Sequence, residues 1–367
     1  MSNLKVNTIN DASGGNAAKL YGVSMRDGGT AFVNRIINGD MRIDQRNNGA
    51  SVTPYFAYTL DRWYGLTTQT GKFSVQQNAG AVTPPSGFTN YLGVTSASAY
   101  SVVSGDTFAI LQKVEGFNFS DLAWGTASAA TVTLSFWVRS SLTGTFGGSL
   151  QNSAANRAYP FIYTISAANT WEQKIVTIAG DTTGTWVGST NGVGVVLNFG
   201  LGSGSTFSGT AGAWAAGNIV QPTGTVSVVG TSGATFFITG VQLEAGTVAS
   251  PFERRDYGRE LMMCQRYLPV WNANSVFGGH AYSSSGFYAY LPFAVSPRVA
   301  PTGLQTTVSG ICWNAAGSSI ALNSIIFGSS VGLSGTQLFC GVASGLVAGN
   351  GTSATNSVNI LFTGCEL

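Results

Sequence analysis

The chain has 367 residues and a formal net charge of +2, with 17 Lys or Arg against 15 Asp or Glu and no basic run. Since nucleic acids are bound through clustered Lys and Arg, this composition argues against a nucleic-acid-binding role. Charged residues make up 9% of the sequence, against about 25% in ordinary soluble domains. No apolar run approaches the roughly 20 residues of a membrane-spanning helix, so we expect no membrane insertion.

Residues 1–33 are polar and rich in glycine, with too few apolar side chains for a core. Leu4 and Val6 alternate with polar residues, which predicts a short strand followed by a loop. Because such a segment becomes ordered by docking, we expect residues 1–33 to attach the chain to a partner protein. The first residues lack the apolar stretch of a signal peptide, so export by that route is not expected.

Between residues 34 and 252, short runs of β-branched and aromatic residues alternate with glycine-rich turns, and no helical period intervenes. This pattern is typical of an antiparallel β-sandwich, and we predict a jelly roll. The predicted strands lie near residues 32–42, 62–67, 72–77, 91–95, 107–115, 131–140, 161–165, 172–178, 193–199 and 234–244. Because alternate residues of a strand share a face, we expect one set to face the core: Val132, Leu134, Phe136 and Val138. The opposite set is Thr133, Ser135 and Arg139.

The residues after Pro251 carry a helical period. An apolar stripe recurs there at spacings of four and three residues: Tyr257, Leu261, Cys264 and Leu268. The same stretch is crowded with Asp, Glu and Arg in an otherwise charge-poor chain. Two interpretations stand: a solvated helix face with ion pairs, or a connector helix (253–268) at which subunits meet. We favour the connector and expect the stripe to make oligomer contacts.

Residues 269–367 contain only Arg298 and Glu366 as formally charged side chains, besides one histidine, His280. A subunit with so little charge is poorly soluble alone, and association that covers much of its surface is the simplest remedy. Strand-like runs near residues 286–294, 306–313, 319–327, 336–342 and 358–362 predict a small β-sandwich.

The cysteines have no CxxC spacing and no histidine partners: Cys264, Cys312, Cys340 and Cys365. We expect buried free thiols in a protein made in a reducing cytoplasm, with a zinc site or a disulfide as open alternatives. No cofactor and no metal are predicted.

Several stretches occur in a set order: 34–41 (NRIINGDM), 60–64 (LDRWY), 237–246 (FITGVQLEAG) and 251–255 (PFERR). Together they resemble motifs of a family of phage and prophage tail-fibre proteins, in which they mark the first and last strands of a jelly roll similar to a carbohydrate-binding module. Residues 260–267 (ELMMCQRY) are similar to the short helix that closes this module. Residues 4–16 resemble the virion-attachment leader of phage fibres. The resemblance covers roughly residues 1–268, and the C-terminal tip matches nothing.

The resemblance implies a homotrimeric fibre subunit that is assembled in the cytoplasm of the bacterial host and incorporated into the virion. Residues 1–33 would bind the phage tail or other virion proteins, and the distal surface of the fibre would bind host cell-surface polysaccharide, through either the jelly roll or the tip. The family's motifs transfer no binding residues. From the residues themselves, Asp61, Arg62 and Trp63 are expected to form a strand entrance with an ion pair and a core indole.

Catalytic chemistry has little support in the residues. His280 follows Gly278 and Gly279 in an expected turn with no neighbouring carboxylate, which disfavours a nucleophile triad. A polysaccharide depolymerase needs two carboxylates about 5–9 Å apart, and the tip holds only Glu366, which leaves a dyad across a subunit boundary. The carboxylates of the larger sandwich are scattered without a signature: Asp106, Glu115, Asp121, Asp181 and Glu244. We expect no enzyme activity.

Sugar binding without hydrolysis needs an exposed aromatic platform with amide or hydroxyl groups at its rim. Tyr288 and Tyr290 share one face of a predicted strand, and Phe287 and Leu291 share the other. If the second face is the core, the tyrosines point outward, either as a glycan platform or as a contact between subunits. Weaker candidates are Tyr282, Trp271 and Trp313, with Trp124, Trp171, Trp186 and Trp214 as counterparts in the larger sandwich.

The sequence thus predicts an all-β homotrimer with an attachment segment (1–33), a jelly roll (34–252), a connector helix (253–268) and a smaller C-terminal sandwich (269–367). We expect a structural, receptor-binding subunit of a bacteriophage tail fibre, which binds host glycan without cleaving it. The alternatives are a purely structural virion protein, such as a head fibre or decoration subunit, and a polysaccharide depolymerase.

Overall fold

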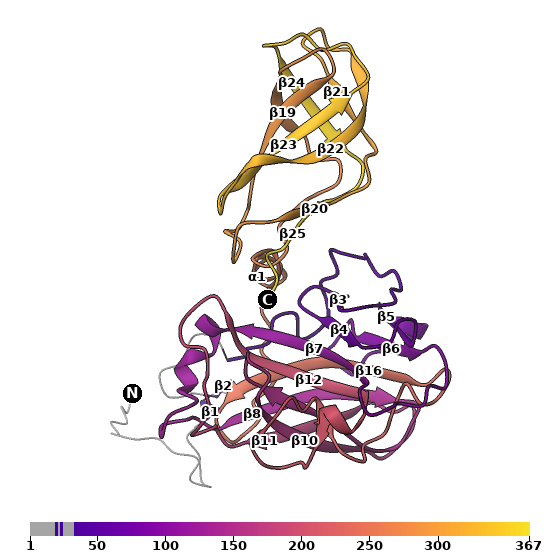
Figure 1. The fold of residues 1–367 in the computed structure, drawn as a ribbon, viewed down its shortest axis with the longest axis vertical. Helices are drawn as coiled ribbons and strands as arrows, with labels where there is room; N and C mark the ends of the chain where they lie inside the picture. Colours follow the sequence, from indigo (N-terminus) through magenta and orange to yellow (C-terminus); the bar gives the residue numbers. More distant parts are fainter. Residues whose placement is uncertain (1–18, 21–22, 25–32) are drawn as a thin grey trace, which may run out of the picture.

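In the computed structural model, the described residues are 19–20, 23–24 and 33–367, without the side chain of Ser329. Strands β1 (Lys19–Leu20) and β2 (Val23–Ser24) form a two-stranded sheet. The rest forms a wide β-sandwich, a short helix and a narrower β-barrel, arranged along the long axis of the molecule (Figure 1). The segment 1–33 lies almost wholly outside the described residues, so its attachment role stays a prediction.

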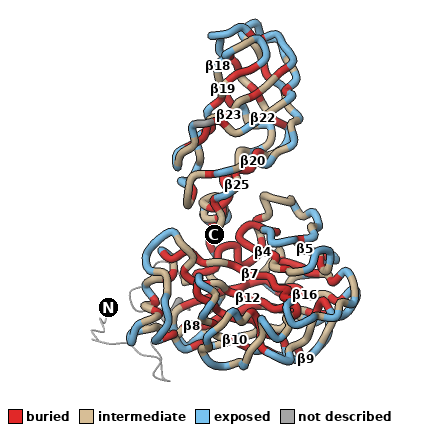
Figure 2. The backbone as a smooth tube through the Cα atoms, viewed as in Figure 1, coloured by how far each residue is buried: buried red, intermediate tan, exposed pale blue. Residues whose placement is uncertain are grey.

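The sandwich consists of two large sheets that share one core (Figure 2). The seven-stranded sheet contains, in spatial order, β14 (Ala215–Ala216), β10 (Arg157–Ile165), β9 (Gly144–Gln151), β12 (Val193–Ser203), β7 (Thr107–Glu115), β4 (Tyr64–Thr67) and β3 (Ala57–Tyr58). The five-stranded sheet contains β11 (Glu172–Ile178), β8 (Val132–Ser140), β16 (Thr235–Ala245), β6 (Leu92–Ser96) and β5 (Phe73–Gln77). The connections hold the paired strands β13 (Ser208–Gly209) and β15 (Gln221–Pro222), and the 3-10 helices η1 (Ala79–Ala81), η2 (Gly116–Asn118), η3 (Ser120–Leu122) and η4 (Ser205–Phe207). The predicted antiparallel sandwich is confirmed.

The predicted core face of β8 is confirmed, because its four apolar members are fully buried: Val132, Leu134, Phe136 and Val138. The opposite face of this central strand is also covered, since Thr133 and Ser135 are buried while Arg139 remains partly exposed. Trp63 is fully buried, as expected, and its indole N–H donates to the Asn38 carbonyl at 3.0 Å.

Two parts of the sandwich differ from the prediction. Residues 33–42 form coil and a turn instead of a strand, because Asn38 and Met41 adopt positive φ angles of 57° and 59°. The Asn38 side chain stabilises this turn by bonding to both backbone groups of Ile43. Strand β9 was not predicted, because its glycines resemble a turn. At Gly148, a β-carbon would clash with the Asn198 carbonyl on β12, so close strand packing requires glycine there.

The predicted helix exists as α1 (Tyr257–Gln265), and the Asp256 side chain caps it by accepting a hydrogen bond from the Arg259 N–H at 2.9 Å. Its apolar stripe does not form the expected subunit contact as a whole. Cys264 packs in one buried cluster with residues of the sandwich, and Leu268 is fully buried. Because the chain itself already covers these two side chains, the prediction of oligomer contacts is wrong for them. Leu261 flanks the same cluster, and Tyr257 is 56% exposed.

The charges around α1 also face inward. Arg255 is buried and pairs with Glu253 at 2.9 Å and with Glu260 at 3.3 Å. Arg266 binds the buried carboxylate of Glu115 at 2.6 Å. For these residues, neither a solvated face nor a contact between subunits describes the outcome, because the ion pairs attach the helix to its own sandwich.

The C-terminal part forms a closed barrel, so the prediction of a second sandwich is wrong. The strand order is β18 (Phe277–Ala281), β19 (Gly286–Pro292), β23 (Gly335–Val342), β22 (Ser319–Val331), β21 (Gly310–Trp313) and β24 (Gly351–Asn356), and β24 pairs with β18. A three-stranded sheet lies beside the helix: β17 (Val270–Trp271), β25 (Ile360–Thr363) and β20 (Gly303–Gln305). The two strands that close the barrel, β18 and β24, are rich in Gly, Ser and Thr and carried no strand signal in the sequence.

After β25 the chain returns to the sandwich and binds it. Glu366 accepts hydrogen bonds from Arg46 at 2.7 Å and from Arg62 at 2.5 Å. The Arg62 side chain is 1% exposed, and its guanidinium lies 3.5 Å from the centre of the Tyr267 ring. The expected ion pair of Arg62 with Asp61 is therefore wrong, because the partner lies at the far end of the sequence.

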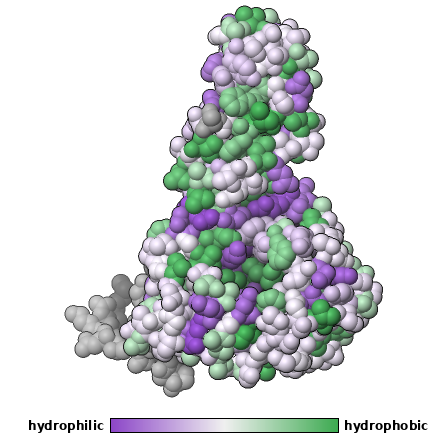
Figure 3. Space-filling view, in the orientation of Figure 1, coloured by the Kyte–Doolittle hydropathy of each residue, from purple (hydrophilic) through white to green (hydrophobic). Residues whose placement is uncertain are grey.

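Arg298 completes this attachment. It donates to the carbonyls of Cys365 at 2.8 Å and Glu366 at 2.5 Å, and it exchanges hydrogen bonds with Asn191 of the sandwich. We call this charged contact zone the junction, made of Arg46, Arg62, Glu115, Arg266, Arg298 and Glu366. Figure 3 shows a hydrophilic band between the barrel and the sandwich.

The cysteines are all buried and unpaired, as expected. Burial raises the pKa of the Cys340 thiol to about 12, so this thiol stays protonated at neutral pH. Within the described part of the chain, no helix has the length and apolar character needed to span a membrane.

Candidate carbohydrate-binding surface

The outer face of the barrel carries a row of large side chains that crosses four neighbouring strands. Strand pairing places His280 of β18 opposite Tyr288 of β19, Tyr288 opposite Phe339 of β23, and Phe339 opposite Ile326 of β22. Their chain neighbours Phe287 and Leu338 are fully buried in the barrel core. The row therefore points outward, and we call these four residues the ridge.

The aromatic rings of the ridge lie close together. Ring centres are 5.3 Å apart for His280 and Tyr288, and 5.0 Å apart for Tyr288 and Phe339. Tyr282, in the connection after β18, extends the group, since its ring centre lies 4.5 Å from that of Tyr288. Tyr282 is 46% exposed and Ile326 is 55% exposed. The spacing is close to the 4.7–4.9 Å between strands, so the rings follow one another in a row, with planes tilted by 40–60° from one ring to the next.

Glycines make room for two tyrosine rings beside the ridge. A β-carbon on Gly286 would clash with the Tyr282 hydroxyl, and one on Gly335 would clash with the hydroxyl of Tyr290. Each of these rings therefore lies over bare backbone. Tyr290 is 53% exposed, and its hydroxyl is 3.4 Å from the Ser334 hydroxyl.

Polar side chains border the ridge on both sides. Ser324 and Asn323 of β22 lie over Gly341, which is the pairing partner of Gly286 in the row next to the ridge. Gln337 of β23 pairs with Tyr290 in the row on the other side. The amides of Asn323 and Gln337 make no side-chain hydrogen bond to any described residue, so both remain available for a ligand.

Charge is absent from this surface. The two formally charged residues after position 268, Arg298 and Glu366, both belong to the junction. Figure 3 shows the barrel mostly in the pale and green colours of uncharged and apolar residues, above the hydrophilic band. A platform of rings with amides and hydroxyls at its rim, and no fixed charge, suits the apolar faces and hydroxyl groups of sugars.

No protein-family model matches this chain, and no curated protein matches it. Among solved structures, the enzymatically active domain of tailspike protein 4 from bacteriophage CBA120 aligns over 58% of this chain with 13% identity and a TM-score of 0.32. The chain spans only 22% of that protein. A putative sugar-binding protein from Bacteroides thetaiotaomicron aligns over 58% of this chain and its own full length, with 11% identity and a TM-score of 0.35.

A family 11 carbohydrate-binding module from Clostridium thermocellum, in complex with a β-1,3-1,4-mixed-linked tetrasaccharide, aligns over 55% of this chain and 98% of its own, with 10% identity and a TM-score of 0.26. Similarity at this level identifies no ligand for the present chain. The case for a binding surface therefore depends on the side chains themselves.

The ridge brings together some of the predicted sugar-binding residues and not others. Tyr288 and Tyr290 lie on β19, and Tyr282 lies in the connection between β18 and β19. The predicted outward orientation of Tyr288 and Tyr290 is confirmed. Trp313 is on the outer face of β21, which pairs with β22 and β24 and does not adjoin β19. It lies across β24 from the strand of His280 and beside β22, but it belongs to a different cross-strand row and makes none of the ring contacts of the ridge.

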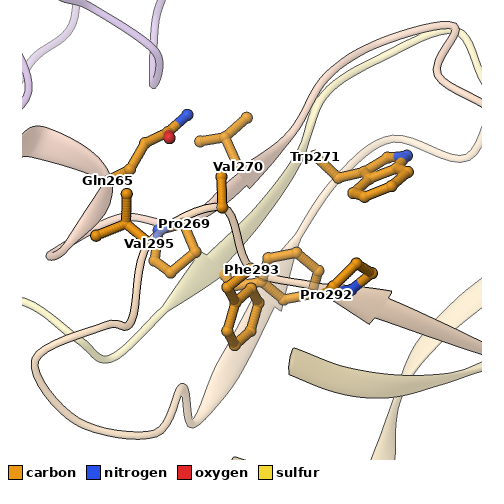
Figure 4. A pocket seen from close by; sticks show the side chains of 9 residues that line it. Gln265, Pro269, Val270, Trp271, Pro292, Phe293 and Val295 are labelled. Atoms are coloured by element: carbon orange, nitrogen blue, oxygen red, sulfur yellow. The ribbon is translucent and has the colours of Figure 1, made fainter. Parts of the chain in front are cut away.

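Trp271 lies at the base of the barrel, beside a small hollow between α1 and the barrel (Figure 4). The side chains that surround the hollow are Gln265, Pro269, Val270, Trp271, Pro292, Phe293, Ala294, Val295 and Phe362. Its free space is about that of one water molecule. A sugar does not fit into this hollow, and Trp271 makes none of the ring contacts of the ridge. Its role as a separate, weaker sugar-binding candidate stays a prediction.

The tryptophans of the sandwich pack mainly on one another. Trp124, Trp186 and Trp214 meet edge to face with ring centres 4.8–5.4 Å apart. Their indole N–H groups donate to the Ala130 carbonyl, Asp181 and the Ala179 carbonyl, respectively. Trp171 packs on Tyr91. Because each N–H of the cluster has a partner in the chain, these rings serve the packing of the loops.

The carboxylates of the sandwich are engaged in structural contacts. Burial raises the pKa of the Glu115 carboxyl, but hydrogen bonds from Arg266 and Tyr267 outweigh it, and the pKa lies below its usual value. Asp181 has a lowered pKa for the same reasons, with Arg157 as its main partner. Burial raises the pKa of Asp61 to about 6, but this side chain is only 1% exposed.

Sequence reasoning missed three of the four ridge residues as binding candidates. Phe339 carried a readable signal, because it alternates with the buried residues Leu338 and Cys340. His280 was expected in a turn but lies in strand β18, so that prediction is wrong. Ile326 sits in an unbroken apolar run, where alternation gives no face. That these residues share one row depends on strand register, which the sequence does not specify.

Proposed function

We propose that this chain is a structural, receptor-binding subunit of a bacteriophage tail fibre that binds glycan on the host surface without cleaving it. The observation that carries the proposal is the outward-facing aromatic ridge, half-buried at Tyr288 and Phe339 and exposed at its ends, with unpartnered amides at its rim. Pyranose rings present apolar faces that stack on such platforms, while their hydroxyls bond to amides and hydroxyls. The tail-fibre motifs in residues 34–41, 60–64, 237–246 and 251–255 support the placement in a virion.

Binding without cleavage is the second part of the proposal. A glycosidase acid needs a raised pKa and access to the glycosidic bond. Glu115 and Asp181 have lowered pKa values, and Asp61 is enclosed. Glu366 is held between two arginines. These features favour carboxylates that hold the fold together over carboxylates that act on a substrate.

The third part is assembly. We propose a homotrimer with residues 1–33 on the phage tail or another virion protein and the barrel distal. The fibre is assembled in the cytoplasm of the bacterial host. The mass of the purified protein in solution tests the trimer: three times the chain mass supports it, and a monomer at high concentration contradicts it.

Adsorption of labelled protein to a panel of bacterial strains tests the binding role. Tyr288→Ala removes the centre of the ridge and should abolish adsorption, with an unchanged circular dichroism spectrum. The control is Tyr55→Ala, because Tyr55 is an exposed tyrosine on the sandwich and not on the barrel. Equal adsorption of both variants would overturn the assignment of the ridge, and reducing sugar released from a bound polysaccharide would overturn binding without cleavage.

A further inference from the structure

We infer that the ridge takes an uncharged glycan, laid across the strands along the row from His280 to Ile326, and that it discriminates against acidic sugars. The inference rests on the proposed function and adds the chemical class of the ligand. It follows from where the few charges of the C-terminal part are placed.

The first step is the location of the charges. Arg298 is held by the carbonyls of Cys365, Glu366 and Asn191, and Glu366 by two arginines of the sandwich. Neither is on the barrel wall. Apart from His280, the strands of the barrel carry no side chain that can hold a positive charge.

The second step is the cost of binding an acidic sugar here. Proteins bind carboxylates, sulfates and phosphates through Arg or Lys, whose hydrogen bonds are charge-assisted. A carboxylate placed against Tyr288 and Phe339 loses water and finds no Arg or Lys as a counter-charge, which is unfavourable. A neutral pyranose loses only hydroxyl hydration, which amide and hydroxyl groups replace.

The third step is the match between the rim and hydroxyl groups. Asn323 and Ser324 border one side of the ridge and Gln337 the other. An amide both donates and accepts, so it suits a hydroxyl, which does the same. The hydroxyls of Tyr282 and Tyr288 make no hydrogen bond to other described residues and offer further partners.

The direction of the ligand follows from the strand register. Rings succeed one another from β18 to β23 at 5.3 and 5.0 Å, whereas along β19 the next outward residues are Gly286 and Tyr290. A sugar chain that runs across the strands therefore meets consecutive rings. The adjoining cross-strand row contains the paired glycines Gly286 and Gly341. Tyr282 lies over Gly286, and Asn323 and Ser324 lie over Gly341.

The experiment compares matched ligands. A panel of neutral β- and α-linked hexose oligosaccharides is titrated against the full chain by calorimetry, and each binder is compared with the same oligosaccharide oxidised to the carboxylate at every C6. We expect the oxidised form to bind at least tenfold more weakly. We also expect the affinity for the neutral form to change less than about twofold between roughly 0.05 and 0.5 M NaCl, because no ion pair is screened.

A gain-of-function variant keeps the outcome interpretable. Gln337→Arg introduces a cation at the rim and should bring the oxidised ligand to within about threefold of the neutral one. Tyr55→Arg, on the sandwich, is the matched control and should change neither affinity. His280→Gln should leave the preference for the neutral ligand intact.

The outcomes separate the two proposals. If no oligosaccharide binds, the proposed function fails and the inference with it. If neutral and oxidised forms bind equally, or the oxidised form binds better, glycan binding stands and the inference is overturned. Tight neutral binding that Tyr288→Ala leaves unchanged overturns the ridge as its location.

Discussion

The junction and the barrel wall use charge in opposite ways. At the junction, arginines and carboxylates from distant parts of the sequence meet in buried ion pairs, with Arg62 only 1% exposed. The barrel wall, by contrast, has no formal charge, and its rings and amides lie on the outer face. The two regions lie on one chain, so its few charges are unevenly distributed between them.

The low charge of the barrel also bears on solubility. The low charge of residues 269–367 suggested a surface that sister chains must cover. A closed barrel offers another solution, because closure removes the unpaired strand edges through which charge-poor sheets aggregate. Edge residues such as Lys, which protect open sheets, are then not needed. The barrel can leave its wall uncharged for a ligand.

The largest effect is expected at the junction, for Glu366→Ala. The variant leaves the buried guanidinium of Arg62 without its carboxylate, and breaking such a pair costs about 3–5 kcal/mol. The free energy of unfolding from urea titration should fall by this amount. The lost stability should appear in the sandwich, although its residues lie far from Glu366 in the sequence.

A double variant tests the cause. Arg62→Met combined with Glu366→Leu removes both charges and should recover most of the lost stability, because hydrophobic replacement of a buried pair is often neutral. If Glu366→Ala alone is as stable as the wild type, the Tyr267 ring and the Lys113 carbonyl satisfy Arg62 without Glu366. The buried ion pair would then contribute little to the stability of the junction.

The second effect belongs to the barrel, for Leu338→Ala. Leu338 is fully buried in the barrel core, and a cavity there should cost about 2–5 kcal/mol. Hydrogen exchange resolved by peptide should show lower protection in residues 277–356 and unchanged protection in β7, β8 and β12. Loss of protection across the whole chain would mean that the junction couples the two parts into one unfolding unit.

How much of the structure can be predicted from the sequence depends on how far apart in the sequence the interacting residues lie. The alternation in β8 and around Tyr288 is local, and both predicted faces were right. The partner of Arg62 is 304 residues away, and the closing strands β18 and β24 have few apolar residues. Local patterns therefore predicted strands and their faces, whereas ion-pair partners and barrel closure arise from long-range packing.

The third prediction concerns how the stability of the sandwich depends on pH. Burial raises the folded-state pKa of Asp61 to about 6 from 3.8, so between these values the folded state holds more protons than the unfolded state. Stability contributed by this group therefore falls as pH rises from about 4 to 6, by on the order of 1–3 kcal/mol. Asp61→Asn should lack this slope in urea titrations of the sandwich signal. An identical slope in the variant would assign it to another group.

The smallest effect on stability, and a specific one on binding, is expected for Gly286→Ala. The added methyl group meets the end of the Tyr282 side chain, which can rotate away, so the free energy of unfolding should change by less than about 1 kcal/mol. The displaced ring leaves the platform, and affinity for a neutral oligosaccharide should fall several-fold. Gly278→Ala is the matched control on the neighbouring strand, because a β-carbon there approaches only the edge of van der Waals range. If both variants bind alike, Tyr282 does not belong to the binding surface, and the ridge ends at Tyr288.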